Sequence, residues 1–323
     1  MNQIPQVSIV MPAFESQRYI AQAIRSIQAQ TLRDFELIVI DDGSTDRTAS
    51  IVSELAREDS RIRLFSQDKA DIAVSRNRGL KEARAPFVAA MDADDVNYRN
   101  RLEMQVAFMN KNPTCVCLGA AVDLCDDRGF VFSTEFHPIG HDQILERLLN
   151  GDGAVIRQPV CMVRADCARS VGGYDSRYSS TEDLDLFLRL SEIGTLSNID
   201  KPLLMYRLHR GSVNQNRYEL QRRHQLHIVR EAHERRRLPF TTQDENNLCY
   251  WPPPSPAEFE SHLAFSMRAQ GHCLNSFRHA FWYVYFSGMS LRSIRRTFAL
   301  IIGPKMSAMV LRAMRSRTFQ SGT

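Results

Sequence analysis

Residues 7–42, VSIVMPAFESQRYIAQAIRSIQAQTLRDFELIVIDD, contain two apolar runs separated by an amphipathic segment. The runs at 7–11 and 36–40 are rich in β-branched residues and do not alternate with polar ones, which is typical of strands buried on both faces of a parallel sheet. The segment at 17–29 has apolar residues at helical spacing: Ile20, Ala23, Ile24 and Ile27. This stretch therefore predicts a β–α–β unit.

The same alternation continues to residue 91, which predicts an α/β domain built on a mostly parallel sheet. Helices are expected at 47–58 and 73–83, and strands at 62–65 and 86–91. Beyond residue 100 the pattern is looser. There we expect helices at 101–110, 143–149 and 183–193 and a strand at 116–122.

The composition, 43% hydrophobic and 24% charged, is that of a folded protein, and 323 residues suffice for one core plus an appendage. The seven cysteines are scattered and none forms a CxxC pair. This pattern indicates buried or unreactive thiols and not a zinc site or a disulfide framework. The N-terminus enters a predicted strand without the zones of a secretory signal. We therefore expect a cytoplasmic chain.

The C-terminal third is basic: residues 221–323 carry 15 Lys+Arg against six Asp+Glu, while the whole chain has a net charge of +4. Helices are predicted at 222–237, 257–270 and 274–286, with a breaker-rich linker at 241–256. No apolar run approaches the roughly 20 residues of a membrane-spanning helix. We predict a domain of residues 1–217 and a basic helical extension of residues 218–323.

This extension is expected to contact an anionic membrane on the inner face of the plasma membrane. The alternatives are a tail that is merely soluble and a homodimer contact through the aromatic helix. Nucleic acid is not an expected partner.

Polar and acidic turns follow three of the predicted strands: PAFE at 12–15, DDGSTD at 41–46 and DADD at 92–95. Ligands of open α/β sheets bind outside the carboxyl ends of the strands, so these turns are expected to meet in one crevice. The chain has no GxGxxG after the first strand and no GxxxxGK[ST], which leaves dinucleotide-binding and P-loop interpretations without support.

Asp92, Asp94 and Asp95 place three carboxylates within four residues, and their mutual repulsion is unfavourable unless a cation is bound. Mg²⁺ or Mn²⁺ takes one or two protein carboxylates and completes its shell with water and phosphate oxygens, so the turn suits a metal-bound diphosphate. The alternative is a solvated acidic turn or a helix cap. Asp41 and Asp42 form a second carboxylate pair that suits contact with a base or ribose.

Five segments in order resemble the family 2 inverting glycosyltransferases of GT-A fold: VSIVMPAFES (7–16), VIDDGSTD (39–46), SRNRGLKEARAPFVAAMDADD (75–95), GGYDSRYSSTEDLDLFLRL (172–190) and YRLHRGS (206–212). The resemblance covers about two thirds of the chain and excludes the basic extension. It implies a Rossmann-like mixed, mostly parallel sheet flanked by helices, with residues 1–217 as the catalytic domain.

The resemblance further implies a metal-dependent hexosyltransferase that uses Mn²⁺ or Mg²⁺. It would move a sugar from a nucleotide-diphospho-sugar, a UDP-sugar, to a saccharide or lipid-linked acceptor in polysaccharide, lipopolysaccharide or glycolipid synthesis. The implied nucleotide-sugar site consists of Pro12, Ala13, Phe14, Glu15, Asp41, Asp42, Arg76, Asp92, Ala93 and Asp94. The implied metal ligands are Asp94, Asp95 and His209.

Asp42 would contact the base through the imide group of a uracil. Arg76 would lie near the nucleotide. Glu15 departs from the family, which commonly has Asn at this position, so it places a negative charge near the nucleotide and leaves the donor open. Asp183, in Thr-Glu-Asp, occupies the position of the catalytic base, and Glu182 would position the acceptor or its loop. Asp183 also begins a predicted helix, whose dipole favours the ionised carboxylate.

The chemistry is understandable from the residues. An acceptor hydroxyl loses a proton as it attacks the anomeric carbon, and a carboxylate within reach can take that proton. One base opposite one leaving group gives a single displacement and hence inversion.

Two other functions are alternatives. A sugar nucleotidyltransferase would also use paired Asp and metal, but it needs a Gly-rich basic loop after the first strand, which PAFESQRYI is not. A non-catalytic nucleotide-sugar-binding module would not need the base, so Asp183 beside the acidic turn argues against it.

Overall fold

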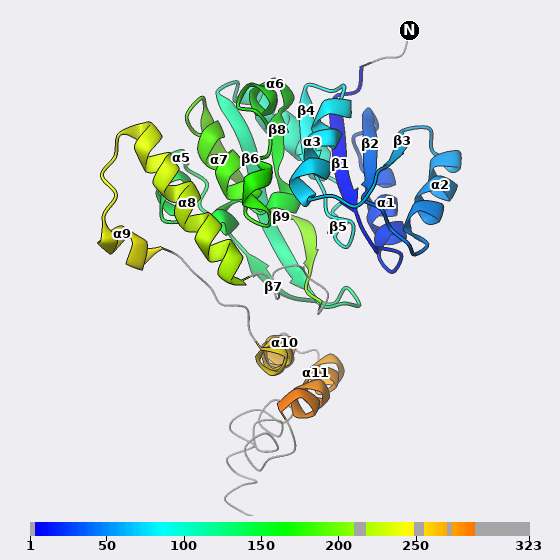
Figure 1. Cartoon of the computed structure of the whole chain (residues 1–323). Coiled ribbons are helices and arrows are strands. Elements are labelled where there is room, and N and C mark those ends of the chain that lie inside the picture. The colour runs from blue at the N-terminus through cyan, green and yellow to red at the C-terminus, as the bar shows by residue number, and fades with distance from the viewer. Residues whose placement is uncertain (1–3, 210–217, 249–254, 270–272, 288–323) are drawn as a thin grey trace, which may run out of the picture. The chain divides into compact units, whose positions relative to one another are not determined.

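The computed structural model describes residues 4–209, 218–248, 255–269 and 273–287 (Figure 1). The chain divides into two compact units. The first comprises Met1–Asp123, Thr134–Arg207 and Asn216–Trp251, and the second comprises Leu124–Ser133, Leu208–Gln215 and Pro252–Thr323. The predicted basic stretch from residue 288 and part of the predicted linker lie outside the described residues.

Four parallel strands form one half of the sheet in the first unit. Strand β1 (Val7–Ala13) lies between β2 (Phe35–Asp41) and β4 (Phe87–Ala90), and β2 also pairs with β3 (Ile62–Ser66). Every residue of β1, β2 and β4 is buried, as expected from their unbroken apolar character. The connecting helices are α1 (Ile20–Gln28), α2 (Thr48–Glu58) and α3 (Ile72–Glu82).

Helix α1 shows why these predictions agree with the structure. Its buried residues are Ile20, Ala23, Ile24 and Ile27, the four apolar positions of the sequence pattern. An amphipathic helix buries this stripe against the sheet, and most of its stability comes from that packing.

Beyond β4 the sheet continues in the order β8, β6, β9 and β5. Strand β8 (Met162–Arg164) is antiparallel to both β4 and β6 (Cys115–Cys125), and β5 (Val96–Asn97) is antiparallel to β9 (Thr195–Arg207). Strand β7 (Val131–Glu135) pairs with β6. The sheet is therefore mixed. Of these strands the sequence predicted only β6.

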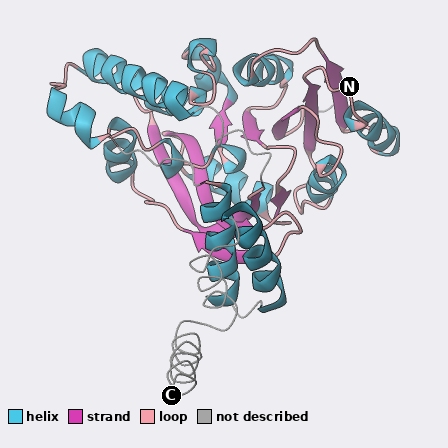
Figure 2. Cartoon of the chain, turned by 60° about the horizontal axis from the view of Figure 1, so that its bottom comes forward, coloured by secondary structure: helices cyan, strands magenta, loops and turns pink. Residues whose placement is uncertain are grey.

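The remaining helices of the first unit follow β4 in the chain. They are α4 (Arg101–Lys111), α5 (His141–Leu149), α6 (Ala165–Ser170), α7 (Glu182–Leu190), α8 (Tyr218–Arg236) and α9 (Thr242–Asn247). Helices α5, α6 and α7 lie beside this second half of the sheet (Figure 1), and helices lie on both sides of the strands (Figure 2). Short 3-10 helices occur at Gly153–Val155, Gln158–Val160 and Ser176–Tyr178. Helices α6 and α9 were not predicted.

Helix α8 packs against α5 and α7, where it buries Ile228, Val229 and Ala232. The first helix after residue 217 therefore belongs to the first compact unit. Whether a functional boundary lies at residue 217 stays a prediction.

In the second unit, α10 (Pro256–Ala269) packs against α11 (Cys273–Ser287), which agrees with the two helices predicted there. Three aromatic side chains spaced four residues apart on α11 are exposed: Phe277, Phe281 and Tyr285. None of the helices within the described ranges has the length and apolar character needed to cross a membrane.

Candidate active site

The carboxyl ends of the parallel strands lie in register. Ala13 of β1 is opposite Asp41 of β2, and Asp41 is opposite Ser66 of β3. The chain leaves β4 through Met91, whose amide donates to the carbonyl of Val10 at 3.1 Å, and enters the DADD turn. The turns PAFE, DDGSTD and DADD thus follow strand ends at one edge of the sheet, where α/β proteins bind their ligands.

Glu15 joins the first two turns. Its Oε1 accepts hydrogen bonds from the amide (2.8 Å) and Oγ1 (2.9 Å) of Thr45, and its own amide donates to Ser44 Oγ at 3.1 Å. Its φ of 48° is uncommon for a residue other than glycine. The negative charge that the sequence placed near a nucleotide is therefore engaged by the DDGSTD turn.

Asp42 is buried and hydrogen-bonded by the segment after β3. Its Oδ1 accepts from Gln67 Nε2 (2.7 Å) and the Ala70 amide (3.0 Å), and its Oδ2 accepts from Lys69 Nζ (2.7 Å). Burial alone would raise the pKa of Asp42, but these hydrogen bonds and the charge of Lys69 outweigh it and lower the pKa. Asp41 accepts from the Ser44 amide at 3.3 Å and so stabilises its own turn.

The DADD turn is held by Arg207, the last residue of β9. The Arg207 amide donates to Asp95 Oδ1 at 2.8 Å, and its Nε donates to the Asp94 carbonyl at 2.7 Å. Asp95 is buried, so the turn is not simply a solvated one, and burial together with Asp94 and Asp92 raises its pKa well above the usual value. Within the described residues Asp95 Oδ2 has no hydrogen-bond partner.

Carboxylate oxygens are ligands that hard divalent cations prefer. The buried Asp95 Oδ2, which has no hydrogen-bond partner within the described residues, fits the role of such a ligand. No group of three or more His, Cys, Asp or Glu in the described part of the chain is arranged to hold a metal. An ion here would therefore take further ligands from phosphate and water. His209 belongs to the second unit and directly precedes residues 210–217, which are not described, so its role stays a prediction.

Arg101, at the start of α4, places a fully buried guanidinium near the acidic turn. It donates to the carbonyls of Ala90 (2.7 Å), Pro159 (2.9 Å) and Cys161 (3.3 Å). Burial lowers its pKa to about 10, although Cys161, Asp95 and Asp92 oppose this. Arg101 thus stays protonated at neutral pH and partly offsets the charge of the turn.

Arg76 of α3 links the DADD turn to α7. Its guanidinium pairs with Glu182 and lies 3.4 Å from Asp92 Oδ1, and its charge centre lies 5.6 Å from the centre of the Tyr174 ring. Burial opposes its charge, but Glu182 and Asp92 outweigh burial and raise the pKa of Arg76. The two ends of the proposed site therefore share one permanent cation.

Glu182 and Asp183 begin α7. Burial raises the pKa of Glu182 to about 7, and the charge of Arg76, which pairs with it, opposes this effect. Burial also raises the pKa of Asp183, with Arg76 opposing. The start of the helix favours the ionised carboxylate of Asp183 and burial opposes it, so the expectation that Asp183 is ionised stays a prediction.

The GGY segment before α7 is fixed by Asn77, which donates to the Tyr174 carbonyl (2.7 Å) and accepts from the Tyr174 amide (2.8 Å). Gly173 has φ 72°, and a Cβ there would lie 2.4 Å from Asn77 Oδ1. The glycine therefore permits the close approach that holds Tyr174 beside Arg76.

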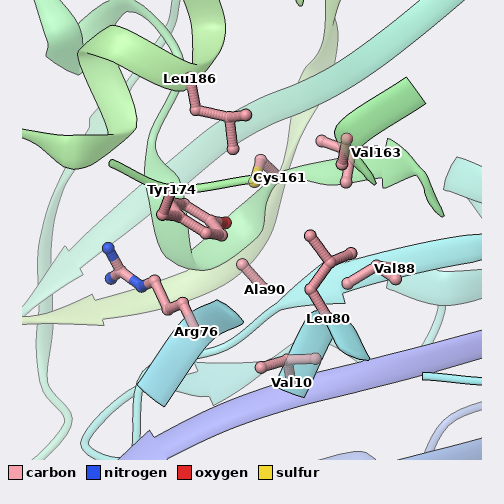
Figure 3. A pocket seen from close by; sticks show the side chains of 10 residues that line it. Val10, Arg76, Leu80, Val88, Ala90, Cys161, Val163, Tyr174 and Leu186 are labelled. Atoms are coloured by element: carbon pink, nitrogen blue, oxygen red, sulfur yellow. The ribbon is translucent and has the colours of Figure 1, made fainter. Parts of the chain in front are cut away.

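Arg76 and Tyr174 also line a pocket (Figure 3). Its other lining side chains are apolar: Val10, Leu80, Val88, Ala90, Cys161, Val163, Ala168 and Leu186. A diphosphate would have few polar partners there, so this pocket does not suit the diphosphate of the donor.

The sequence missed Lys69, Arg101, Arg207 and Asn77. Arg207 lies inside the quoted YRLHRGS segment, and Lys69 follows a predicted strand at the same sheet edge. The sequence therefore contains a signal for both residues. Asn77 lies inside the quoted segment 75–95, whereas Arg101 lies outside every quoted segment and gives no such signal.

The glycosyl transferase family 2 model matches residues 8–171. The chain belongs to glycosyl transferase family 2. It is 34% identical over 199 residues to the putative glycosyltransferase EpsE of Bacillus subtilis (strain 168). The aligned region covers 60% of this chain and 69% of EpsE.

Two solved structures share the fold. S. aureus TarS 1–349 in complex with UDP has a TM-score of 0.56 at 19% identity, covering 98% of this chain and 92% of that one. The mannosyltransferase PcManGT from Pyrobaculum calidifontis in complex with GDP-Man and Mn²⁺ has a TM-score of 0.55 at 15% identity, covering 98% and 84%. The predicted GT-A fold is confirmed, and the chain is a glycosyltransferase.

Proposed function

We propose that this glycosyltransferase moves a hexose from a UDP-sugar to an acceptor hydroxyl with inversion, and that it depends on a divalent metal. The observation that supports this best is the position of Arg76, which contacts both Asp92 of the acidic turn and Glu182 beside the proposed base Asp183. The donor diphosphate would then bind near Asp92 and the acceptor hydroxyl near Glu182, with Arg76 ion-paired to both carboxylates.

In the proposed step Asp183 accepts the proton of the acceptor hydroxyl. The hydroxyl oxygen forms a bond to the anomeric carbon while the bond from that carbon to the phosphate oxygen breaks, and UDP leaves with the bonding electrons. The raised pKa of Asp183 makes it a stronger base than an exposed carboxylate, which suits this role. Glu182 positions the acceptor loop through Arg76.

Asp94 and Asp95, together with His209, would hold Mn²⁺ or Mg²⁺. The ion would neutralise charge on the departing diphosphate. Arg207 fixes the conformation of this turn, because its amide donates to the Asp95 carboxylate and its Nε donates to the Asp94 carbonyl. The binding of Mn²⁺ by PcManGT supports this assignment as an analogy of fold.

We further propose a lipid-linked or surface saccharide acceptor, met in the cytoplasm at the inner face of the plasma membrane. The basic sequence from residue 221 and the exposed aromatic residues of α11 support this, because cationic and aromatic groups favour an anionic lipid surface. The acceptor would belong to polysaccharide, lipopolysaccharide or glycolipid synthesis.

The test combines binding and turnover. Calorimetry with UDP, GDP, CDP and dTDP, with and without Mn²⁺, is expected to show UDP binding that needs metal and is lost in Asp94→Ala. Asp183→Asn should retain that binding but release UDP from its UDP-sugar about a hundredfold or more slowly. Asp200→Asn, the same change at an exposed position, is the matched control. Unchanged turnover in Asp183→Asn would overturn the mechanism.

A further inference from the structure

Lys69 forms an ion pair with Asp42, the residue proposed to contact the donor base. Its ammonium is 2.7 Å from Asp42 Oδ2 and 3.5 Å from the centre of the Phe14 ring. The side chain of Lys69 is 53% exposed and Phe14 is 45% exposed, whereas that of Asp42 is only 5% exposed. An incoming base therefore meets Lys69 and Phe14 at the surface, with Asp42 behind them.

The hydrogen-bonding capacity of this pair is only partly used within the described residues. A carboxylate accepts about four hydrogen bonds, and Asp42 receives its side-chain hydrogen bonds from Gln67, Ala70 and Lys69. An ammonium donates three, and Lys69 directs one to Asp42. An acceptor position and free donor positions thus remain side by side.

Nucleobases differ in which group they would present to such a pair. Uracil has an N3–H donor next to the O4 acceptor, and guanine has an N1–H donor next to the O6 acceptor. Cytosine and adenine have the opposite order, a ring nitrogen acceptor next to an amino donor. With the Asp42 carboxylate facing the ring nitrogen and the Lys69 ammonium facing the neighbouring exocyclic group, only the first order matches the pair.

We propose that Asp42 and Lys69 form an acceptor–donor pair that selects nucleotide donors with keto bases, uracil or guanine, over cytosine and adenine. This proposal rests on the proposed nucleotide-sugar function and adds Lys69 to it as a specificity-determining residue. The Lys69 ammonium donates to the base carbonyl, while Asp42 accepts from the ring N–H.

The backbone holds the pair in place. Gly43 has φ 77°, and a Cβ on it would lie 2.8 Å from the Lys69 amide nitrogen. The Ala70 amide donates directly to Asp42. The segment after β3 is therefore seated on the DDG turn through its main chain, which keeps the Lys69 side chain near Asp42 before any donor binds.

The test is the affinity of UDP, GDP, CDP and ADP measured by calorimetry with Mn²⁺ for the full chain, Lys69→Met and Lys69→Arg. The full chain is expected to bind UDP at least about tenfold more tightly than CDP. Lys69→Met should reduce this UDP-to-CDP ratio about tenfold, and Lys69→Arg should retain most of it because the charged donor remains. Lys81→Met, an equal charge change at an exposed position of α3, should leave the ratio unchanged.

The outcomes separate the two proposals. If Lys69 only stabilises the turn, Lys69→Met will weaken UDP and CDP equally, and the unchanged ratio will overturn base selection. Equal affinity of the full chain for UDP and CDP will also overturn it, while leaving a nucleotide-dependent transferase intact. Absence of binding by every nucleotide will overturn the proposed function itself, and base selection with it.

Discussion

At the scale of single residues, Gly43 decides what can lie beside Asp42. Its φ of 77° is in the left-handed region, which glycine adopts without the steric penalty of a side chain. The Lys69 amide nitrogen also occupies the space where a Cβ would be. Both the turn and the approach of the β3–α3 segment therefore depend on this glycine.

Gly43→Ala is expected to lower the free energy of unfolding by about 1–3 kcal/mol, because the left-handed backbone is strained for alanine and the Lys69 backbone must move. Urea denaturation measures this change. Gly140→Ala is the matched control, since no atom lies within 4 Å of its Cβ position and its φ is −77°. Equal effects of the two substitutions would contradict the steric argument.

The sequence predicted the carboxylates of the candidate site better than their partners. Asp42 and Asp92 were found because acidic residues directly after apolar strands form a pattern. Lys69, Arg101 and Arg207 are single basic residues, and a single basic residue is most often a solvated one. Lys69 and Arg207 stand at positions that a strand end and the YRLHRGS segment mark, but their partners lie more than twenty residues away in the sequence. Arg101 is marked by no pattern.

At the scale of helices and strands, the parallel half of the sheet was predictable, and the antiparallel half was not, apart from β6. Strands β1 and β2 are seven residues long and buried throughout, so their composition identifies them. Strands β8 and β5 have three and two residues, too few to show a period. Strand β9 mixes buried and exposed residues without regular alternation.

In the second unit, α11 carries a buried histidine between two carboxylates. His279 Nδ1 lies 2.7 Å from Glu260 of α10, and its Nε2 lies 3.5 Å from Asp126 of the β6–β7 connection. Arg278 pairs with Asp126 and Asp127 at 2.6 and 2.7 Å. Burial and Arg278 oppose protonation, but Asp126 and Glu260 outweigh them and raise the pKa of His279.

A raised pKa in the folded state means that protonated His279 stabilises the fold below pH 6.5 and that this stabilisation is lost as pH rises through the folded-state pKa. We expect the thermal unfolding midpoint of the α10–α11 pair to fall between pH 6 and pH 9. Trp282 fluorescence in a Trp251→Phe background reports on α11. His279→Gln should flatten the pH dependence, whereas His224→Gln on α8 should not. A midpoint that rises with pH would contradict this assignment.

At the scale of the whole molecule, charge and aromatic residues are unevenly distributed along the chain. Residues 288–323 contain seven Lys+Arg and no Asp or Glu. Before them, α11 exposes Phe277, Phe281 and Tyr285. Aromatic side chains favour the interface between lipid headgroups and acyl chains, and nearby Lys and Arg each add roughly 1 kcal/mol at an anionic surface.

We therefore expect the full chain to sediment with vesicles containing anionic lipid and to remain in the supernatant with neutral vesicles. Salt should weaken the association, since it screens the charges. Phe281→Ser with Tyr285→Ser should reduce the bound fraction several-fold because two exposed apolar side chains are removed. Phe136→Ser, at an exposed aromatic residue of the first unit, is the matched control. Equal partition with both vesicle types would exclude the membrane contact.

The strand order also affects how the chain is made. Strands β1 to β4 all lie within residues 7–90, but the neighbour of β4 on its other side is β8, Met162–Arg164. At roughly 5–20 residues per second, a ribosome needs several seconds more to produce β8. During that interval a nascent chain has an apolar β4 edge without its partner, and unpaired edges readily join other chains. We therefore expect this stage of synthesis to be the one most in need of a chaperone.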